Sequence, residues 1–176
     1  PFLHKENRHS TSGGFLLQER GVTIRNSKTW PSGPERRRGP DAEHVVGWNA
    51  QGQRTESHPD VALLHTRLAI MDPRPEADQP FGNDDGSVWL CYNGEVYDWQ
   101  QHADELRRLG VQFKTHADTE FILRGYETWG LEGLLPRLRG MFAFAILDWN
   151  KREVFVVRDR MGLKPLIYTT ANGGLV

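Results

Sequence analysis

A few polar residues of this sequence have the side chains needed to bind a small zwitterion and to stabilise a developing anion. Arg67 carries a planar guanidinium that can hold a carboxylate through two parallel hydrogen bonds. Asp118 can hold an ammonium group, and the amide of Asn93 and the backbone N–H of Gly94 can converge on one oxygen. Such a pair of donors has the form of an oxyanion hole, in which each donor typically contributes about 2.7–4 kcal/mol of transition-state stabilisation.

Each of these residues also has a purely structural interpretation. Arg67 can be one half of an ion pair, and Asp118 can cap a helix. The pair Asn93-Gly94 taken alone is most often a turn. Residue type and spacing leave both interpretations open.

The chain around these residues has the apolar patterns of strands and helices that would position them. Apolar runs or alternation predict strands over residues 61–70, 88–92, 111–115, 141–147 and 153–157. Helical spacing predicts a helix from Asp98 to a stop at Gly110, and another from an N-cap at Asp118 to a stop at Gly130. The first helix is expected to bury Trp99, Ala103, Leu106 and Leu109. A shorter helix is indicated over residues 131–138, with Pro136 disturbing it.

The order of strands, then helices, then strands again predicts layered sheets flanked by helices, not a doubly wound parallel sheet. The strand over residues 88–92 is expected to pair with the strand over residues 61–70, and Asn83-Asp84-Asp85-Gly86 is a turn signal between them. On a strand, Cys91 and Asn93 would point to the same face.

The composition is that of an ordinary globular domain. The chain has 176 residues, of which 38% are hydrophobic and 26% charged. A formal net charge of -1 gives no general attraction for nucleic acid. The single cysteine excludes an intrachain disulfide, and the seven histidines show no metal-ligand spacing. Because no apolar run approaches the roughly 18 residues that span a bilayer, a soluble, cytoplasmic protein without membrane contact is expected.

The first 37 residues differ in character from the rest. Residues 1–37 are rich in Arg, Ser, Gly and Pro and have no sustained periodicity, which predicts a mostly irregular segment. The regular patterns start at Arg38, so residues 38–176 are expected to form the domain.

An ordered series of motifs gives residues 38–176 a resemblance to a known family. The motifs are RGPD at 38–41, HTRL at 65–68, NGEVYD at 93–98, ADTE at 117–120, LRGMFAFAILD at 138–148 and RDRMGLKPLIY at 158–168. In this order they resemble the glutaminase domain of glutamine-hydrolysing asparagine synthetases, a class II glutamine amidotransferase. The resemblance implies an α+β fold, the four-layer α/β/β/α sandwich of N-terminal-nucleophile hydrolases, here truncated at both ends.

The resemblance also implies roles for the residues above. Arg67 would bind the α-carboxylate of glutamine, Asp118 its α-ammonium group, and Glu95 would complete the substrate loop. Asn93 and Gly94 would form the oxyanion hole. No cofactor or metal is implied for this domain, because ATP and Mg²⁺ belong to a C-terminal synthetase domain, which is the implied partner. A homodimer is a further expectation.

The nucleophile of the family has no counterpart in this sequence. The family uses an N-terminal cysteine whose own amino group acts as base, whereas residue 1 here is Pro1 and no Cys-Gly pair occurs in residues 1–37. Ser12, if exposed by processing, and Cys91 are the substitutes to consider, and Cys91 is expected to be a core residue. We therefore expect no glutaminase turnover from this chain.

Three interpretations of that difference remain open. The chain can derive from an asparagine synthetase whose N-terminal segment is lost or altered in this sequence. It can be a scaffold without a nucleophile, in the manner of the β-lactam synthetase relatives that do not hydrolyse glutamine. It can also be an amino-acid-binding module without chemistry.

Overall fold

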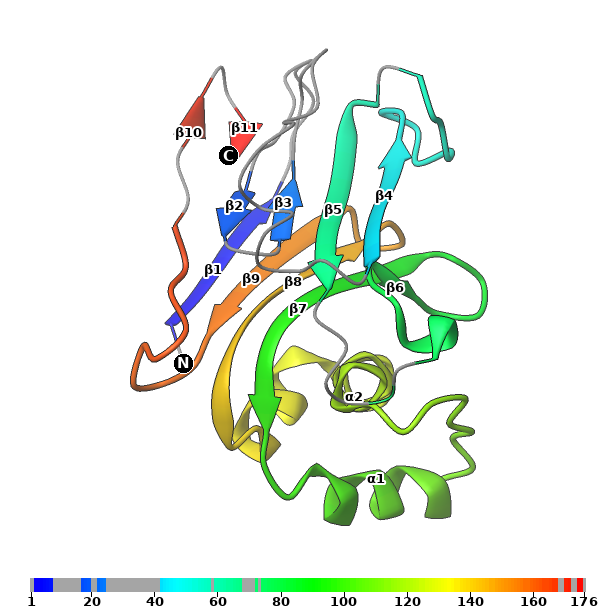
Figure 1. Ribbon diagram of the computed structural model, residues 1–176, viewed down its shortest axis with the longest axis vertical. Coiled ribbons are helices and arrows are strands. Elements are labelled where there is room, and N and C mark those ends of the chain that lie inside the picture. Colours follow the sequence, from blue (N-terminus) through cyan, green and yellow to red (C-terminus); the bar gives the residue numbers. More distant parts are fainter. Residues whose placement is uncertain are drawn as a thin grey trace.

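In a computed structural model of the chain, two antiparallel sheets lie face to face, and two helices cover the outer face of the larger sheet (Figure 1). The structure describes residues 2–7, 17–19, 22–24, 42–57, 59–67, 72, 74–167, 170–171 and 174–175. One apolar core fills the space between the larger sheet and the helices, and a second lies between the two sheets. These layers agree with the predicted sandwich.

The larger sheet has the order β1-β9-β8-β7-β6. Its strands are β1 (Phe2–Asn7), β6 (Phe81–Gly82), β7 (Val88–Val96), β8 (Gly140–Asp148) and β9 (Glu153–Arg158). The predictions for β8 as a strand buried on both faces and for β9 as its partner are confirmed, but burial does not alternate along β9, because Phe155, Val156 and Val157 are all buried. Seven of the nine β8 residues are buried, because the helices cover one face and the second sheet covers the other.

The smaller sheet has the order β2-β3-β5-β4. Its strands are β2 (Leu17–Glu19), β3 (Val22–Ile24), β4 (Ala42–Trp48) and β5 (Val61–Arg67). A separate two-stranded pair consists of β10 (Thr170–Ala171) and β11 (Gly174–Leu175). All seven residues of β5 are buried, as its apolar pattern predicted, and residues 68–70 of that prediction lie outside the described ranges.

Both predicted helices are present. The first, α1 (Trp99–Arg108), buries Trp99, Ala103 and Leu106, but Leu109 lies beyond its end and is 62% exposed, so including Leu109 in the buried face was wrong. The second, α2 (Asp118–Leu134), is broken at Gly130, whose φ of 66° and ψ of 179° are not helical, so the predicted stop there is confirmed. Beyond the break, the last turn of α2 and the 3₁₀ helix η3 (Leu135–Arg137) take the place of the short helix predicted over residues 131–138. The glycine supplies the backbone conformation for the break, since other residues rarely adopt it.

The expected pairing of residues 88–92 with residues 61–70 is wrong. These segments belong to different sheets: β7 pairs with β6 and β8, whereas β5 pairs with β3 and β4. The turn signal is real but joins β6 to β7, where the N–H of Asn83 donates to the carbonyl of Val88 at 3.0 Å. Periodicity predicted the strands correctly but carried no information on which sheet each one joins.

Residues 111–115 do not form the predicted strand. The N–H groups of Lys114 and Thr115 donate to the carboxylate of Glu120, at 3.0 and 2.7 Å, and not to another strand. Glu120 is completely buried in the first turn of α2, and these hydrogen bonds replace those that a sheet would have made.

The N-terminal segment is more regular than expected. Three strands, β1 to β3, lie within residues 1–37, so the prediction of irregular structure is wrong for them. The other residues of this segment lie outside the described ranges, and the boundary between residues 37 and 38 stays a prediction. Of the four expected layers, the described residues supply three, namely the helices and the two sheets.

Candidate functional site

The candidate site lies at the edge of β7 that β6 leaves uncovered. β6 pairs only with Trp89 and Leu90, at the beginning of β7. Further along that edge, side chains take the place of a neighbouring strand. The N–H of Tyr92 donates to Oε1 of Gln79 at 2.6 Å, and the N–H of Val96 donates to Oδ2 of Asp118 at 3.0 Å.

Gly94 lies midway between these two bridged positions. Because backbone N–H groups alternate in direction along a strand, the N–H of Gly94 points to the same edge as those of Tyr92 and Val96. Its partner on β8, Phe142, accordingly bonds away from β7, since its carbonyl accepts from the N–H of Asp159 at 2.8 Å. The predicted donor of Gly94 therefore lies at the uncovered edge.

The close approach of β7 and β8 requires a glycine at position 94. A Cβ atom there would meet the carbonyl oxygen of Met141 at 2.3 Å and Cα of Phe142 at 2.6 Å. Both contacts are with backbone, which cannot swing aside as a flexible side chain would. A turn is therefore not the reason for the Asn93-Gly94 pair, which lies inside β7.

Asn93 and Glu95 leave β7 on the face opposite to Tyr92. Alternation puts them on the same face as Cys91, which belongs to the core between the two sheets. Asn93 is partly buried, whereas Glu95 is exposed. Asn93 and Gly94 are therefore adjacent residues inside β7, with the side chain of Asn93 on one face of the strand and the N–H of Gly94 at its edge.

Asp118 is buried at the beginning of α2. Its Oδ2 accepts from the hydroxyl of Tyr92 at 2.5 Å as well as from the N–H of Val96. The helix N-cap is Ala117, so the interpretation of Asp118 as the N-cap was wrong by one residue. Burial raises the pKa of Asp118, and the hydrogen bonds from Tyr92 and Val96 act against that rise.

Arg67 ends β5 and is only 9% exposed. Its Nη1 donates to Oδ1 of Asp78 at 2.6 Å and to the carbonyl of Arg74 at 3.3 Å, and its Nη2 donates to the carbonyl of Asp72. Oδ2 of Asp78 also pairs with Nε2 of His44 at 3.0 Å. Arg67 therefore forms the ion pair that the structural interpretation predicted, and its partner is the carboxylate of Asp78.

The segment from Asp72 to Gln79 connects the three parts of the site. Its first residue, Asp72, accepts from the N–H of His116, just before α2, at 2.9 Å. A hydrogen bond from Arg74 is the main cause that lowers the pKa of Asp72 below its usual range. At the other end Asp78 holds Arg67, and Gln79 holds Tyr92 of β7. One short segment thus contacts Arg67, the β7 edge and the approach to α2.

His65 lies on the face of β5 that points toward β7. Its Nε2 lies 3.2 Å from the carbonyl of Tyr92, and its Nδ1 is buried with no hydrogen-bond partner among the described residues. Burial is the main cause that lowers the pKa of His65 to about 4, so the ring is neutral at pH 7. With Tyr92 accepting, Nε2 carries the proton and Nδ1 is a bare acceptor.

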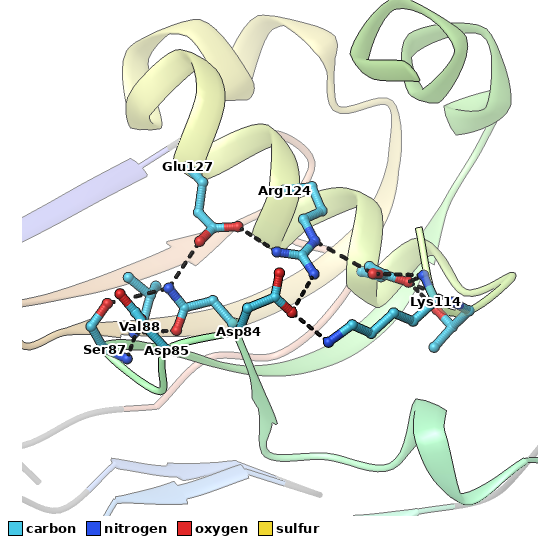
Figure 2. Close-up of polar contacts among 10 residues, drawn as sticks. Asp84, Asp85, Ser87, Val88, Lys114, Arg124 and Glu127 are labelled. Atoms are coloured by element: carbon cyan, nitrogen blue, oxygen red, sulfur yellow. Dashed lines mark hydrogen bonds and ion pairs between the residues drawn. The ribbon is translucent and has the colours of Figure 1, made fainter. Parts of the chain in front are cut away.

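A polar network fastens α2 to the turn between β6 and β7 (Figure 2). Arg124 donates to Glu120, to Glu127 and to Asp84, and Lys114 also donates to Asp84. The hydrogen bonds from Arg124 and Lys114 lower the pKa of Asp84 to about 2. The network holds α2 in place along β7, and so fixes where Asp118 meets the strand edge.

Cys91 is a core residue, as the sequence predicted. Its side chain has no exposed surface and packs between the two sheets, and burial raises its pKa. Within the described ranges, no three or more His, Cys, Asp or Glu side chains are grouped so that they could hold a metal ion. No helix in the described part of the chain is both long and apolar enough to cross a lipid bilayer.

Sequence reasoning missed four residues of this site: His65, Asp78, Gln79 and Tyr92. Asp78-Gln79 precedes Pro80 in a segment without periodicity, and nothing in its pattern shows that both side chains are directed at strands. His65 belongs to the HTRL motif, but it was counted among scattered histidines. Tyr92 was recognised only as an apolar strand position.

Two stacked antiparallel sheets with helices on the outer face of the larger sheet define the class of the protein. It is an α+β fold of the N-terminal-nucleophile hydrolase type, in agreement with a solved amidotransferase of the same fold. The chain belongs to the glutamine amidotransferase domain family, which it matches over residues 32–176.

Known relatives and a solved structure agree with that assignment. The chain is 34% identical over 134 residues to amidase chry2 of Gibberella zeae, and 41% identical over 116 residues to glutamine-hydrolysing asparagine synthetase 2 of Bacillus subtilis. These matches cover 74% and 66% of this chain but only 19% and 15% of the relatives. Glutamine phosphoribosylpyrophosphate amidotransferase from B. subtilis has the same fold, with a TM-score of 0.60 and 22% identity over 74% of this chain and 33% of that one.

Proposed function

We propose that this domain binds free glutamine at the uncovered edge of β7. The observation that carries the proposal is the position of the Gly94 N–H, which faces that edge between the side-chain bridges of Gln79 and Asp118. A backbone donor held in this way can stabilise the oxyanion that forms when a nucleophile adds to an amide carbonyl. Asn93 supplies the second donor.

Charge complementarity supports the rest of the assignment. We assign the α-carboxylate of glutamine to Arg67, the α-ammonium group to Asp118, and the border of the substrate loop to Glu95. Arg67 already binds the carboxylate of Asp78, so the carboxylate of glutamine would bind beside that carboxylate or in its place. A cation beside Asp118 favours the ionised carboxylate, which burial alone disfavours.

The activity of the whole protein is a further part of the proposal. In the manner of the asparagine synthetase relatives, water and glutamine would give glutamate and ammonia, and the ammonia would pass to a synthetase domain that uses ATP and Mg²⁺. The segment after β9 exposes Met161, Leu163 and Ile167, which supports contact between this face and another domain. A homodimer, and the absence of nucleic-acid binding, stay predictions.

Calorimetric titration of L-glutamine into the 176-residue chain tests the binding step. We expect saturable binding that Arg67→Lys weakens by about tenfold or more, because an ammonium cannot reproduce the planar fork. Arg107→Lys on the exposed side of α1 is the matched control and should bind as the wild type does. Absence of glutamine binding by the folded wild type, or equal affinity in Arg67→Lys, would contradict the proposal.

A further inference from the structure

Gln79 uses both ends of its side-chain amide on a single backbone residue. Oε1 accepts from the N–H of Tyr92 at 2.6 Å, and Nε2 donates to the carbonyl of the same residue at 3.0 Å. This is the pair of hydrogen bonds that a residue of an adjacent antiparallel strand would make. Gln79 is 7% exposed, and its Nε2 also lies 3.5 Å from Oγ1 of Thr119 on α2.

The contact between Gln79 and Tyr92 lies just beyond the part of β7 that pairs with β6. β6 pairs only with Trp89 and Leu90 and so lies beside the beginning of β7 (Figure 1). Tyr92 is the next residue of β7 whose N–H and C=O face that edge. The next one after it is Gly94. Gln79 therefore replaces the strand for one residue, and within the described ranges no strand pairs with this edge at Gly94, where the proposed anion donor lies.

We infer that Gln79 is a positioning residue for the Gly94 N–H. The inference rests on the proposed function, because that donor matters only if an oxyanion or an amide oxygen binds there. An adjacent strand that continued past Leu90 would use the N–H of Gly94 in the sheet. A strand edge with no partner at Tyr92 would leave a buried amide unpaired and free to shift. Gln79 avoids both results, because it bonds to the N–H and C=O of Tyr92 but does not pair with Gly94 as a strand would.

A second contact to Tyr92, made by a histidine, supports this assignment. Nε2 of His65 also lies 3.2 Å from the carbonyl of Tyr92, so this carbonyl receives donors from two segments. Four residues further along the strand, the N–H of Val96 is held by Asp118. Gly94 thus lies between two points at which side chains, and not a strand, bond to the edge of β7 opposite β8.

Amide hydrogen exchange on the ligand-free 176-residue chain gives the first test. Gln79→Met keeps the length of the side chain but removes both hydrogen bonds, and Gln79→Glu keeps only the acceptor for the Tyr92 N–H. We expect exchange at Tyr92 to become at least about tenfold faster in Gln79→Met and to change little in Gln79→Glu. Cys91 and Asn93, whose N–H groups face β8, are internal references, and Gln101→Met on the exposed side of α1 is the control. Equal acceleration at Tyr92, Cys91 and Asn93 would overturn the inference, since it would show general loosening of the sheet.

The shift of the Gly94 amide resonance on addition of glutamine gives the second test. We expect Gln79→Met to reduce this shift and to weaken glutamine binding about tenfold, Gln79→Glu to have a smaller effect on both, and Gln101→Met to leave both unchanged. A role in stability alone would lower the melting temperature but leave the shift and affinity of the folded protein intact, and this result would overturn the inference. If the wild type shows no shift and no binding, the proposed function fails, and hydrogen exchange then decides only whether Gln79 holds Tyr92.

Discussion

The hydroxyl of Tyr92 donates a hydrogen bond to the carboxylate of Asp118 at 2.5 Å, and so joins the middle of β7 to the first turn of α2. Both residues are buried, and the same carboxylate oxygen also accepts from Val96. Asp118 therefore has a structural task in addition to the ligand-binding role proposed for it.

Removal of the Asp118 carboxylate should lower the stability of the fold. Asp118→Ala leaves the Tyr92 hydroxyl and the Val96 N–H buried without this acceptor, which should cost about 1–3 kcal/mol for each group. Asp118→Asn retains an acceptor oxygen and should cost less. Urea denaturation measures the free energy of unfolding, and Asp104→Ala on the exposed face of α1 should change it by less than about 1 kcal/mol. Equal losses for Asp118→Ala and Asp104→Ala would show that Asp118 does not hold the strand to the helix.

A methyl group at position 94 should separate β7 from β8. The added Cβ would lie 2.3 Å from a backbone oxygen, so we expect Gly94→Ala to cost about 3 kcal/mol or more. Gly86→Ala is the matched control, because no described atom lies within 4 Å of the added Cβ, while the φ of +72° opposes alanine. That change should cost about 1–2 kcal/mol. Thermal and urea unfolding of both variants compares the two, and a smaller loss for Gly94→Ala would contradict the predicted clash.

Acid should destabilise the fold through His65. Its pKa is about 4 in the folded protein and 6.5 ordinarily, so the unfolded chain binds the proton more tightly. The resulting stability is fully present above pH 6.5 and is lost as the pH falls through about 4, with a total on the order of 3 kcal/mol. Arg67, Asp78 and His44 add smaller effects on this pKa, in opposing directions.

Unfolding experiments at several pH values measure this dependence. His65→Gln can still donate to Tyr92 but does not titrate, so its stability should vary less between pH 6.5 and 4 than that of the wild type. His102→Gln, at a partly exposed position on α1, should keep the wild-type dependence. Parallel curves for the wild type and His65→Gln would rule out His65 as the source.

The thiol of Cys91 should be unreactive, and the 176-residue chain should release no ammonia from glutamine above background. Cys91 is the single cysteine in this sequence, and its complete burial raises its pKa and keeps it from forming a thiolate nucleophile. A thiol reagent should label it only after unfolding, and Cys91→Ala should leave background ammonia release unchanged. Ammonia release that Cys91→Ala abolishes would overturn this prediction.

The sequence predicted those parts of the fold that depend on local pattern. The apolar run of β8 and the helical stripe of α1 predicted which residues of these elements are buried, apart from Leu109, and β9 was correctly predicted as a strand. The pairing of β7 depends on the path of the chain between the two sheets, and the expected β5 partner was wrong. Residues 111–115 were misassigned because Glu120, further along the chain, supplies their hydrogen bonds.

The residues of the site were likewise predicted where local sequence was sufficient and missed where contacts between distant residues decide. Arg67, Asn93, Gly94, Glu95 and Asp118 were selected by their chemistry and their motifs, and the structure gives each of them a position while their roles stay proposals. The contacts of Asp78 with Arg67 and of Gln79 with Tyr92 reach across 11 and 13 residues of sequence, and no periodicity reports contacts of that kind.

Asp78 and Gln79 are consecutive residues, which links the two ends of the site mechanically. A ligand carboxylate that took the place of Asp78 on Arg67 would release Asp78, one peptide bond away from the residue that holds Tyr92. Occupation of the carboxylate site would then be transmitted to the edge where an amide oxygen would bind. An amide without an amino-acid backbone would not trigger this transmission, so the domain would discriminate against it by geometry as well as by affinity.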